Sequence, residues 1–268
     1  NHVNGRDIDL FERSICKYLK VKYCVALNSG TDALVCGLVA LGIKRGDEVI
    51  TPPNSFISST SSIAHVGAIP VFADVKNDQT IDPVKIIEKI TPKTKAIMPV
   101  HLTGRLSQMD EIKKISKKYN IPIIEDAAQS ILSKYKSFES GTSGLIGCFS
   151  AHPLKNLNAI GDAGFVVTNN KRIANTIKLM RNHNLVDRNK VSKFGFVSRM
   201  DTIQATILLY RLKNLKKIIA KRRKNASLYK NLLNKGKIYF NQDDKNYFDT
   251  YHTFVIQVEN RNSLQKYL

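Results

Sequence analysis

Acidic side chains are scarce in this 268-residue sequence: 22 aspartates and glutamates stand against 42 lysines and arginines, a formal net charge of +20. Long apolar runs are missing too, because none approaches the ~18 residues that a bilayer-spanning helix needs. Residues 1–9 are polar and lack the apolar core of a signal peptide. Since 43% of the residues are hydrophobic, enough for a packed interior, the composition argues against disorder and predicts a soluble globular protein.

Cysteine is also sparse. The four cysteines are Cys16, Cys24, Cys36 and Cys148, and no two of them form a Cys-x-x-Cys pair. The last three lie in apolar runs, which is typical of small buried side chains. The pattern fits neither a zinc site nor a disulfide scaffold, and it predicts a protein of the reducing cytoplasm.

The basic excess has two interpretations. A strong positive field attracts phosphates, so a nucleic-acid-binding or regulatory protein is one of them. The other is a solvated, lysine-rich surface, because the lysines recur inside helical patterns such as residues 113–118 and 213–221. No zinc-finger, RNA-recognition or KH signature accompanies the lysines, which favours the solvated surface. Such a surface would still favour an anionic small substrate.

Short apolar runs alternate with helical patterns through the first half of the chain. We expect strands at Tyr23–Leu27, Glu48–Thr51, Ile69–Ala73, Lys95–Pro99 and Ile121–Glu125, and helices at Thr31–Leu41, Ser58–His65, Pro83–Ile90 and Gln108–Tyr119. The strands are continuous apolar runs without polar alternation, as in a buried, mainly parallel sheet. The sequence therefore predicts an α/β fold with a doubly wound sheet.

The pattern changes in the second half. We expect strands at Cys148–Ala151, Ala163–Thr168 and Tyr251–Val258, a helix at Lys171–Arg181 and a long helix at Thr202–Leu233 with room for one break. Residues 1–215 are predicted to form a large domain, and residues 216–268 the start of a smaller C-terminal α/β domain. One helix and one strand cannot bury each other's faces. We therefore expect both ends of the natural protein to extend beyond this chain.

Polar residues follow three of the predicted strands, where ligands bind in open α/β sheets. Gly30 and Thr31 open the first helix, whose N-terminus would stabilise a phosphate, although an ordinary helix cap explains them equally well. Asp126 could hold a pyridoxal ring nitrogen in its protonated form, or it could cap a helix. Lys155 lies among small and apolar residues, where a lowered pKa would make it a Schiff-base nucleophile. A surface lysine is the alternative.

Six segments become informative when they are considered together. They are Ser29–Leu34 (SGTDAL), Glu125–Gln129 (EDAAQ), Ser150–Asn156 (SAHPLKN), Gly161–Gly164 (GDAG), Arg181–His183 (RNH) and Ser198–Asp201 (SRMD). In their order and spacing, over nearly the whole chain, they resemble the DegT/DnrJ family of sugar aminotransferases. The resemblance implies an aspartate-aminotransferase-like, fold-type I homodimer that uses pyridoxal 5'-phosphate and needs no metal. Residues 1–215 would then be the cofactor-binding domain.

The resemblance also implies roles for single residues. Lys155 would carry the cofactor as a Schiff base, and Asp126 would hold its pyridine nitrogen. Gln129 would contact the region of the ring's 3-hydroxyl group. Phe56 would stack on the ring, although a phenylalanine in this segment also fits plain core packing. The phosphate would be bound by Gly30, Thr31 and Ser150.

The reaction implied is a transamination. An amino acid, with L-glutamate expected, would give its amino group to a keto group of a nucleotide-linked sugar, and Lys155 would move the proton. A keto-cyclitol substrate is the alternative within the family. Dehydratase members have histidine in place of the lysine, so Lys155 argues against dehydration.

Two positions depart from the family pattern. Val197 stands where members commonly have an asparagine that reaches the partner subunit's cofactor phosphate, which puts that contribution in doubt. Thr103 replaces the tyrosine of the family's His-Leu-Tyr-Gly segment and is followed two residues later by Arg105. The second departure changes a surface that we expect to face the substrate.

Overall fold

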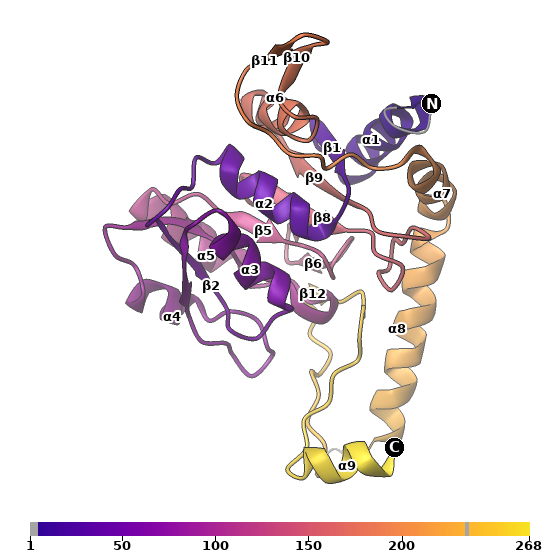
Figure 1. Cartoon of the computed structure of the whole chain (residues 1–268). Helices are drawn as coiled ribbons and strands as arrows, with labels where there is room; N and C mark the ends of the chain where they lie inside the picture. The colour runs from indigo at the N-terminus through magenta and orange to yellow at the C-terminus, as the bar shows by residue number, and fades with distance from the viewer. Residues whose placement is uncertain (1–4, 234–235) are drawn as a thin grey trace.

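The computed structural model describes residues 5–233 and 236–268, and a mixed β-sheet lies at its centre (Figure 1). Strands β1 (Tyr23–Leu27), β9 (Gly164–Thr168), β8 (Ile146–Ser150) and β5 (Ile124–Asp126) pair in that order, and β3 (Ile69–Phe72), β2 (Glu48–Thr51) and β4 (Thr94–Ile97) form a second set. Parallel bridges from Ile97 to Ile123 and from Val100 to Asp126 join β4 to β5. The order across the sheet is therefore β3-β2-β4-β5-β8-β9-β1.

The direction of the strands confirms the prediction of a mainly parallel sheet. Strand β9 runs antiparallel to both of its neighbours, whereas the pairs β2–β3, β2–β4 and β5–β8 are parallel. The carboxyl ends of parallel strands meet at one edge of a sheet. Asp126 at the end of β5 is accordingly in register with Cys148 in β8, and the loop that carries Lys155 follows β8.

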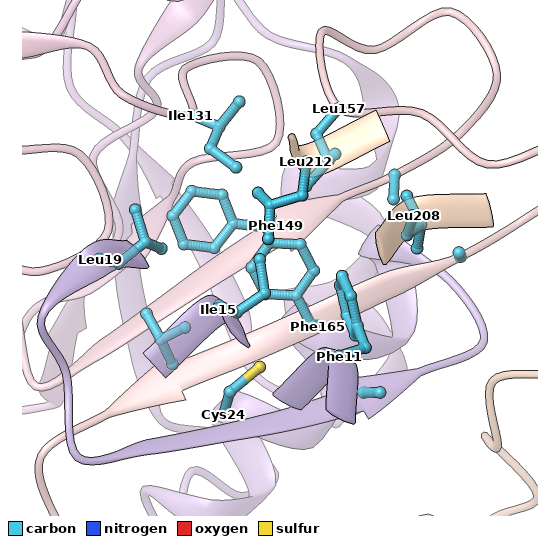
Figure 2. Close-up of a cluster of buried hydrophobic side chains, with 14 of the residues drawn as sticks. Phe11, Ile15, Leu19, Cys24, Ile131, Phe149, Leu157, Phe165, Leu208 and Leu212 are labelled. Atoms are coloured by element: carbon cyan, nitrogen blue, oxygen red, sulfur yellow. The ribbon is translucent and has the colours of Figure 1, made fainter. Parts of the chain in front are cut away.

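Alternate residues of the central strands face opposite layers of helices, since successive side chains of a strand point to opposite faces. Phe149 of β8 and Phe165 of β9 stack at a centroid distance of 4.8 Å, and Phe11 of α1 (Arg6–Leu19) packs edge-on against Phe165 at 5.5 Å (Figure 2). This core also contains apolar residues of α7 (Thr202–Leu212). On the other face, Cys148 and Val166 pack with α2 (Gly30–Ala40) and α6 (Lys171–Met180). The sheet is thus covered on both faces, as a doubly wound fold requires.

Three further helices surround the other half of the sheet. Helices α4 (Pro83–Glu88) and α5 (Met109–Tyr119) enclose a third apolar cluster with β2 and β4. Helix α3 (Ile57–His65) contributes Ile63 to the cluster beneath α2. The polar first turn of α3 lies near the end of β5, because the Ser59 side chain contacts Asp126.

The predicted long helix is broken once, as expected. Helix α7 ends at Leu212, and α8 (Leu215–Leu232) begins after Lys213 and Asn214. Figure 1 shows α8 running away from the sheet, with α9 (Arg261–Tyr267) at its far end and the intervening chain returning toward the sheet. That chain adds β12 (Tyr247–Phe248) to a small antiparallel sheet with β6 (Lys134–Tyr135) and β7 (Phe138–Glu139). A separate hairpin consists of β10 (Leu185–Asp187) and β11 (Lys190–Val191).

The predicted strand at Tyr251–Val258 is wrong. The structure describes only one isolated bridge there, between Gln257 and Tyr239. Tyr251 has a left-handed backbone (φ 46°), which interrupts an extended strand. Its neighbours instead bond to a loop, since the His252 N–H donates to the Thr103 carbonyl at 2.9 Å.

No helix among the described residues is long and apolar enough to cross a membrane. The exposed lysines predicted on α5 and α8 are confirmed, and so is the burial of Cys24, Cys36 and Cys148.

Candidate active site

The site is built around a buried carboxylate at the carboxyl edge of the sheet. Asp126 ends β5 and is 4% exposed. Its Oδ1 accepts the Ala128 N–H at 3.1 Å, and its Oδ2 accepts the Ser59 hydroxyl at 2.6 Å. No helix follows it directly in the described chain, so the helix-cap interpretation is wrong. No lysine, arginine or histidine of the described residues forms an ion pair with Asp126, which leaves a buried negative charge without a protein cation.

Lys155 lies in the loop that follows β8, next to the end of β5. Its backbone N–H donates to the His152 carbonyl at 2.8 Å, which closes a turn. Burial lowers the pKa of Lys155, and the negative charge of Asp126 acts in the opposite direction. A lowered pKa increases the neutral, nucleophilic fraction of the amine. The surface-lysine interpretation is therefore not supported, although Leu154 and Ile160 on either side of the lysine are exposed.

The first turn of α2 meets the end of β8 closely. A Cβ atom added at Gly30 would lie 2.6 Å from the Ser150 Cβ, so only glycine allows this approach. The Ser29 side chain caps the helix by accepting the Asp32 N–H at 3.0 Å. Ser29 is therefore the residue that caps the helix. The Ser150 hydroxyl lies beside Gly30 at the same helix end. A helix N-terminus with a nearby hydroxyl is suited to a phosphate.

Phe56 directly precedes α3 and is 66% exposed. Core packing, the alternative interpretation of this residue, is therefore wrong. Two residues further, the Ser58 hydroxyl bonds to the Thr31 hydroxyl at 2.9 Å. The structure thus brings the start of α3 together with the start of α2, and it leaves an aromatic ring free to stack on a ligand.

Gln129 is fixed through its side-chain oxygen. Oε1 accepts the Thr103 N–H at 2.7 Å, and Thr103 has a left-handed backbone (φ 60°) in the short helix η1 (Leu102–Gly104). The amide nitrogen of Gln129 is then the atom left to donate a hydrogen bond. This arrangement fits a contact with a hydroxyl or a phenolate oxygen.

A group that the sequence did not point to is His252. Its Nδ1 is buried and has no hydrogen-bond partner among the described residues. Burial lowers the pKa of His252 to about 4, and the positive charges of Lys155 and Arg222 act in the same direction. The ring is thus neutral at pH 7 and lies within electrostatic reach of Lys155. The local sequence indicated only a strand at His252. Its electrostatic interaction with Lys155 joins residues almost a hundred positions apart.

A second buried acid supports the loop behind the site. Glu125 accepts the backbone N–H groups of Gly141 and Ser143 at 2.9 and 2.7 Å, and His101 Nε2 lies 2.8 Å from its Oε2. The backbone N–H of Ser107 donates to His101 Nδ1 at 3.2 Å, so Nε2 carries the proton and donates to Glu125. Glu125 is therefore held by more protein donors than its neighbour Asp126, whose two oxygens accept one side-chain or backbone hydrogen bond each.

The sheet order and this site define an aspartate-aminotransferase-like transferase of fold type I, as predicted. The model of the DegT/DnrJ/EryC1/StrS aminotransferase family matches residues 1–268, and the chain belongs to that family.

Two relatives illustrate the range of names in the family. The chain is 36% identical over 265 residues to the UDP-2-acetamido-2-deoxy-3-oxo-D-glucuronate aminotransferase of Pseudomonas aeruginosa, covering 98% of this chain and 74% of the relative. It is 34% identical over 269 residues to the erythromycin biosynthesis sensory transduction protein EryC1 of Saccharopolyspora erythraea, covering 100% and 74%.

Solved structures agree with this assignment. The crystal structure of S. venezuelae DesV in complex with a ketimine intermediate matches with a TM-score of 0.95 at 32% identity, over 98% of this chain and 72% of that chain. NtdA from Bacillus subtilis, with its bound cofactor PMP, matches with a TM-score of 0.90 at 36% identity, over 98% and 61%.

Proposed function

We propose that this chain is a pyridoxal-phosphate-dependent aminotransferase that transfers an amino group from an amino acid, with L-glutamate the expected donor, to a keto group of a nucleotide-linked sugar. The observation that carries the proposal is that two groups of opposite charge lie near one another at one sheet edge. Asp126 is a buried carboxylate with no ion-pair partner among the described residues, and Lys155, which its charge reaches, has a pKa lowered by burial. The name of the Pseudomonas relative supports the substrate class, and PMP in NtdA supports the cofactor.

The residues present fit the cofactor. Asp126 would pair with the ring nitrogen, because its buried carboxylate accepts hydrogen bonds from two neutral donors, Ser59 and Ala128, and forms no ion pair among the described residues. Phe56 would stack on the ring face, and Gln129 would donate to the oxygen at the ring's 3-position. The phosphate would be held by Gly30, Thr31 and Ser150, where the close approach of Gly30 and Ser150 leaves no room for a larger side chain.

Bound pyridoxal phosphate supplies an electron-withdrawing ring that stabilises negative charge next to the transferred nitrogen. The protein supplies orientation and proton transfer. Lys155 would hold the cofactor covalently, and its Nζ, when free and neutral, would accept the proton from the α-carbon of the amino donor. The pKa of Lys155 is lowered in the direction that this role requires.

We further propose that two copies of the chain assemble. The hairpin β10–β11 and the segment after it expose several apolar side chains, including Val191, a fully exposed Phe194 and Val197. Large apolar side chains gathered on one protruding segment favour contact with another protein surface. The resemblance to the family implies that this region reaches the partner subunit, where Val197 would make an apolar contact in place of the asparagine.

The division into a cofactor-binding domain (residues 1–215) and the start of a small domain (216–268) also belongs to the proposal. Helix α8 supports it by leading away from the sheet (Figure 1). The four free cysteines support a cytoplasmic location, where thiols stay reduced.

A screen of substrates tests the proposed function. The purified chain is loaded with pyridoxamine phosphate, and nucleotide keto-sugars and a keto-inositol are added while the visible absorbance of the cofactor is followed. We expect conversion by at least one nucleotide keto-sugar. Conversion by the keto-inositol alone would assign a cyclitol substrate instead, and conversion by neither, with 2-oxoglutarate inactive as well, would contradict an aminotransferase.

A regulatory role is the second candidate, because the Saccharopolyspora relative is named a sensory transduction protein and the chain carries a net charge of +20. This candidate predicts DNA binding that weakens steeply with salt and no binding of pyridoxal phosphate. Fluorescence anisotropy with labelled duplex DNA at two salt concentrations tests the first expectation.

A further inference from the structure

A chain of three side chains leads from the start of α3 to the carboxylate of Asp126. The Ser59 hydroxyl lies 2.6 Å from Asp126 Oδ2, and the Ser55 hydroxyl lies 2.6 Å from that of Ser59. Ser59 is 1% exposed. An ionised carboxylate only accepts hydrogen bonds, so the single hydroxyl proton of Ser59 must point to Asp126. The proton between the two serines then comes from Ser55, which fixes the direction of the chain as Ser55 to Ser59 to Asp126.

These bonds restrain the carboxylate from two elements at once. Oδ2 is held by Ser59 from α3, and Oδ1 is held by the backbone N–H of Ala128 in the turn after β5. The backbone of Asp126 is fixed as well, because its N–H donates to the Pro99 carbonyl at 3.0 Å and its carbonyl accepts the His101 N–H at 3.0 Å. Rotation of the carboxylate about its Cβ–Cγ bond is therefore opposed by a donor at each oxygen.

The same turn of α3 also reaches the other end of the site. Ser58, the residue before Ser59, bonds to the hydroxyl of Thr31 at the start of α2. Phe56 lies two residues before Ser58 and exposes its ring. The first turn of α3 thus contacts Asp126, the proposed partner of the ring nitrogen, and Thr31, a proposed phosphate ligand. It directly follows Phe56, the residue proposed to stack on the ring.

We propose that Ser59 is a positioning residue for the reaction: its hydroxyl holds the Asp126 carboxylate in the orientation that the pyridine nitrogen of the cofactor requires. The inference rests on the proposed function. Ser59 is a neutral donor, so it orients the carboxylate without neutralising the charge that a cationic ring nitrogen needs. Small errors in the placement of a catalytic group cost about 100-fold in rate, which gives the expected scale of its effect.

The test uses three variants of the whole chain. Ser59→Ala removes the donor, and Ser59→Thr retains it. Ser62→Ala is the matched control, since Ser62 is also buried on α3 and its hydroxyl donates to the Ser59 carbonyl at 3.0 Å, away from Asp126. For each variant we would measure the affinity for pyridoxal phosphate, the rate of the half-reaction with L-glutamate, and the ¹⁵N chemical shift of the cofactor's ring nitrogen in a ¹⁵N-labelled sample.

We expect Ser59→Ala to slow the half-reaction by about 10- to 100-fold and to move the ring-nitrogen shift toward the unprotonated value. Its cofactor affinity should change much less, because Lys155 and the phosphate contacts remain. Ser59→Thr and Ser62→Ala should retain the rate and the shift of the unmodified chain.

Equal losses in Ser59→Ala and Ser62→Ala would show a purely structural role and overturn the inference. An unchanged shift and rate in Ser59→Ala would also overturn it, with the proposed function intact. If the unmodified chain bound no pyridoxal phosphate, the proposed function itself would fail. Should Ser59→Thr prove poorly folded, the comparison of Ser59→Ala with Ser62→Ala still decides.

Discussion

The Asp126 carboxylate lies close enough to the Lys155 amine to oppose the effect of burial on the pKa of that amine. Asp126 ends β5 and Lys155 lies in the loop after β8, and these two strands are adjacent and parallel, so their carboxyl ends share one edge of the sheet. An acid and an amine that are 29 positions apart in the sequence are therefore brought together by sheet topology.

Replacing Asp126 by asparagine should nearly abolish the first half-reaction. The substitution keeps the shape of the side chain but removes the buried charge, and loss of one preorganised electrostatic contact typically costs about 100- to 1,000-fold in rate. Stopped-flow absorbance with L-glutamate measures this. Glu111→Gln is the control, because this glutamate pairs with Lys114 on the exposed face of α5. A loss below threefold in Asp126→Asn would contradict the assigned role.

Gly30→Ala should weaken cofactor binding by at least about 10-fold. The new Cβ would lie 2.6 Å from the Ser150 Cβ and 3.0 Å from its Cα, so α2 and β8 must separate where the phosphate is expected to bind. Titration of the chain with pyridoxal phosphate gives the affinity. Gly37→Ala, on the same helix, meets mainly the end of the Ile124 side chain and should leave the affinity unchanged. Equal effects of both variants would contradict a phosphate site at Gly30.

Burial of the neutral His252 ring should make the free energy of unfolding smaller in mild acid than at neutral pH. Because the pKa of His252 falls from 6.5 to about 4 on folding, the unfolded chain binds this proton more readily than the folded chain. The contribution of His252 is complete above pH 6.5 and is lost as the pH falls toward 4. Thermal unfolding at pH 7 and pH 5 measures it. In His252→Gln the decrease in Tm between these pH values should be smaller, and an identical decrease would contradict the prediction.

Glu12→Ala should destabilise the fold strongly. Glu12 Oε1 accepts a bond from Arg181 Nη1 at 2.6 Å and another from the Ala26 N–H at 2.9 Å, in a largely buried site. Removing one member of a buried ion pair costs about 3–5 kcal/mol, or a decrease in Tm of roughly 10 °C. Calorimetry without cofactor measures the change. Glu111→Ala should stay within about 0.5 kcal/mol, and equal effects of the two variants would contradict a structural role for the Glu12–Arg181 pair.

The strands of the sheet could be predicted because their signal is local. Tyr23–Leu27 and Glu48–Thr51 are short apolar runs that lie between turn residues, and both match the structure. Helix α1 was not predicted, although Phe11, Ile15 and Leu19 recur at four-residue spacing. Charged residues such as Glu12 separate these apolar positions, so no continuous apolar run marks the helix in the sequence.

The site could be predicted only in part. Asp126 and Lys155 follow strands, so their place at the sheet edge could be inferred from the topology rule. Ser59 lies in the serine-rich segment 58–62, where nothing local distinguishes the serine that contacts Asp126 from its neighbours. The position of His252 near Lys155 depends on how the chain between α8 and α9 returns toward the sheet. Contacts of this kind are set by packing between distant segments, which periodicity does not encode.

The proposed aminotransferase function requires that Lys155 carries pyridoxal phosphate. The most direct measurement is to reduce the loaded chain with borohydride, digest it and locate the added phosphopyridoxyl mass by peptide sequencing in the mass spectrometer, with Lys155→Ala as the comparison. We predict a visible absorbance band that borohydride removes, one modified peptide that contains Lys155, and no transaminase turnover in the variant. Modification at another lysine, or full turnover in Lys155→Ala, would rule out this role of Lys155.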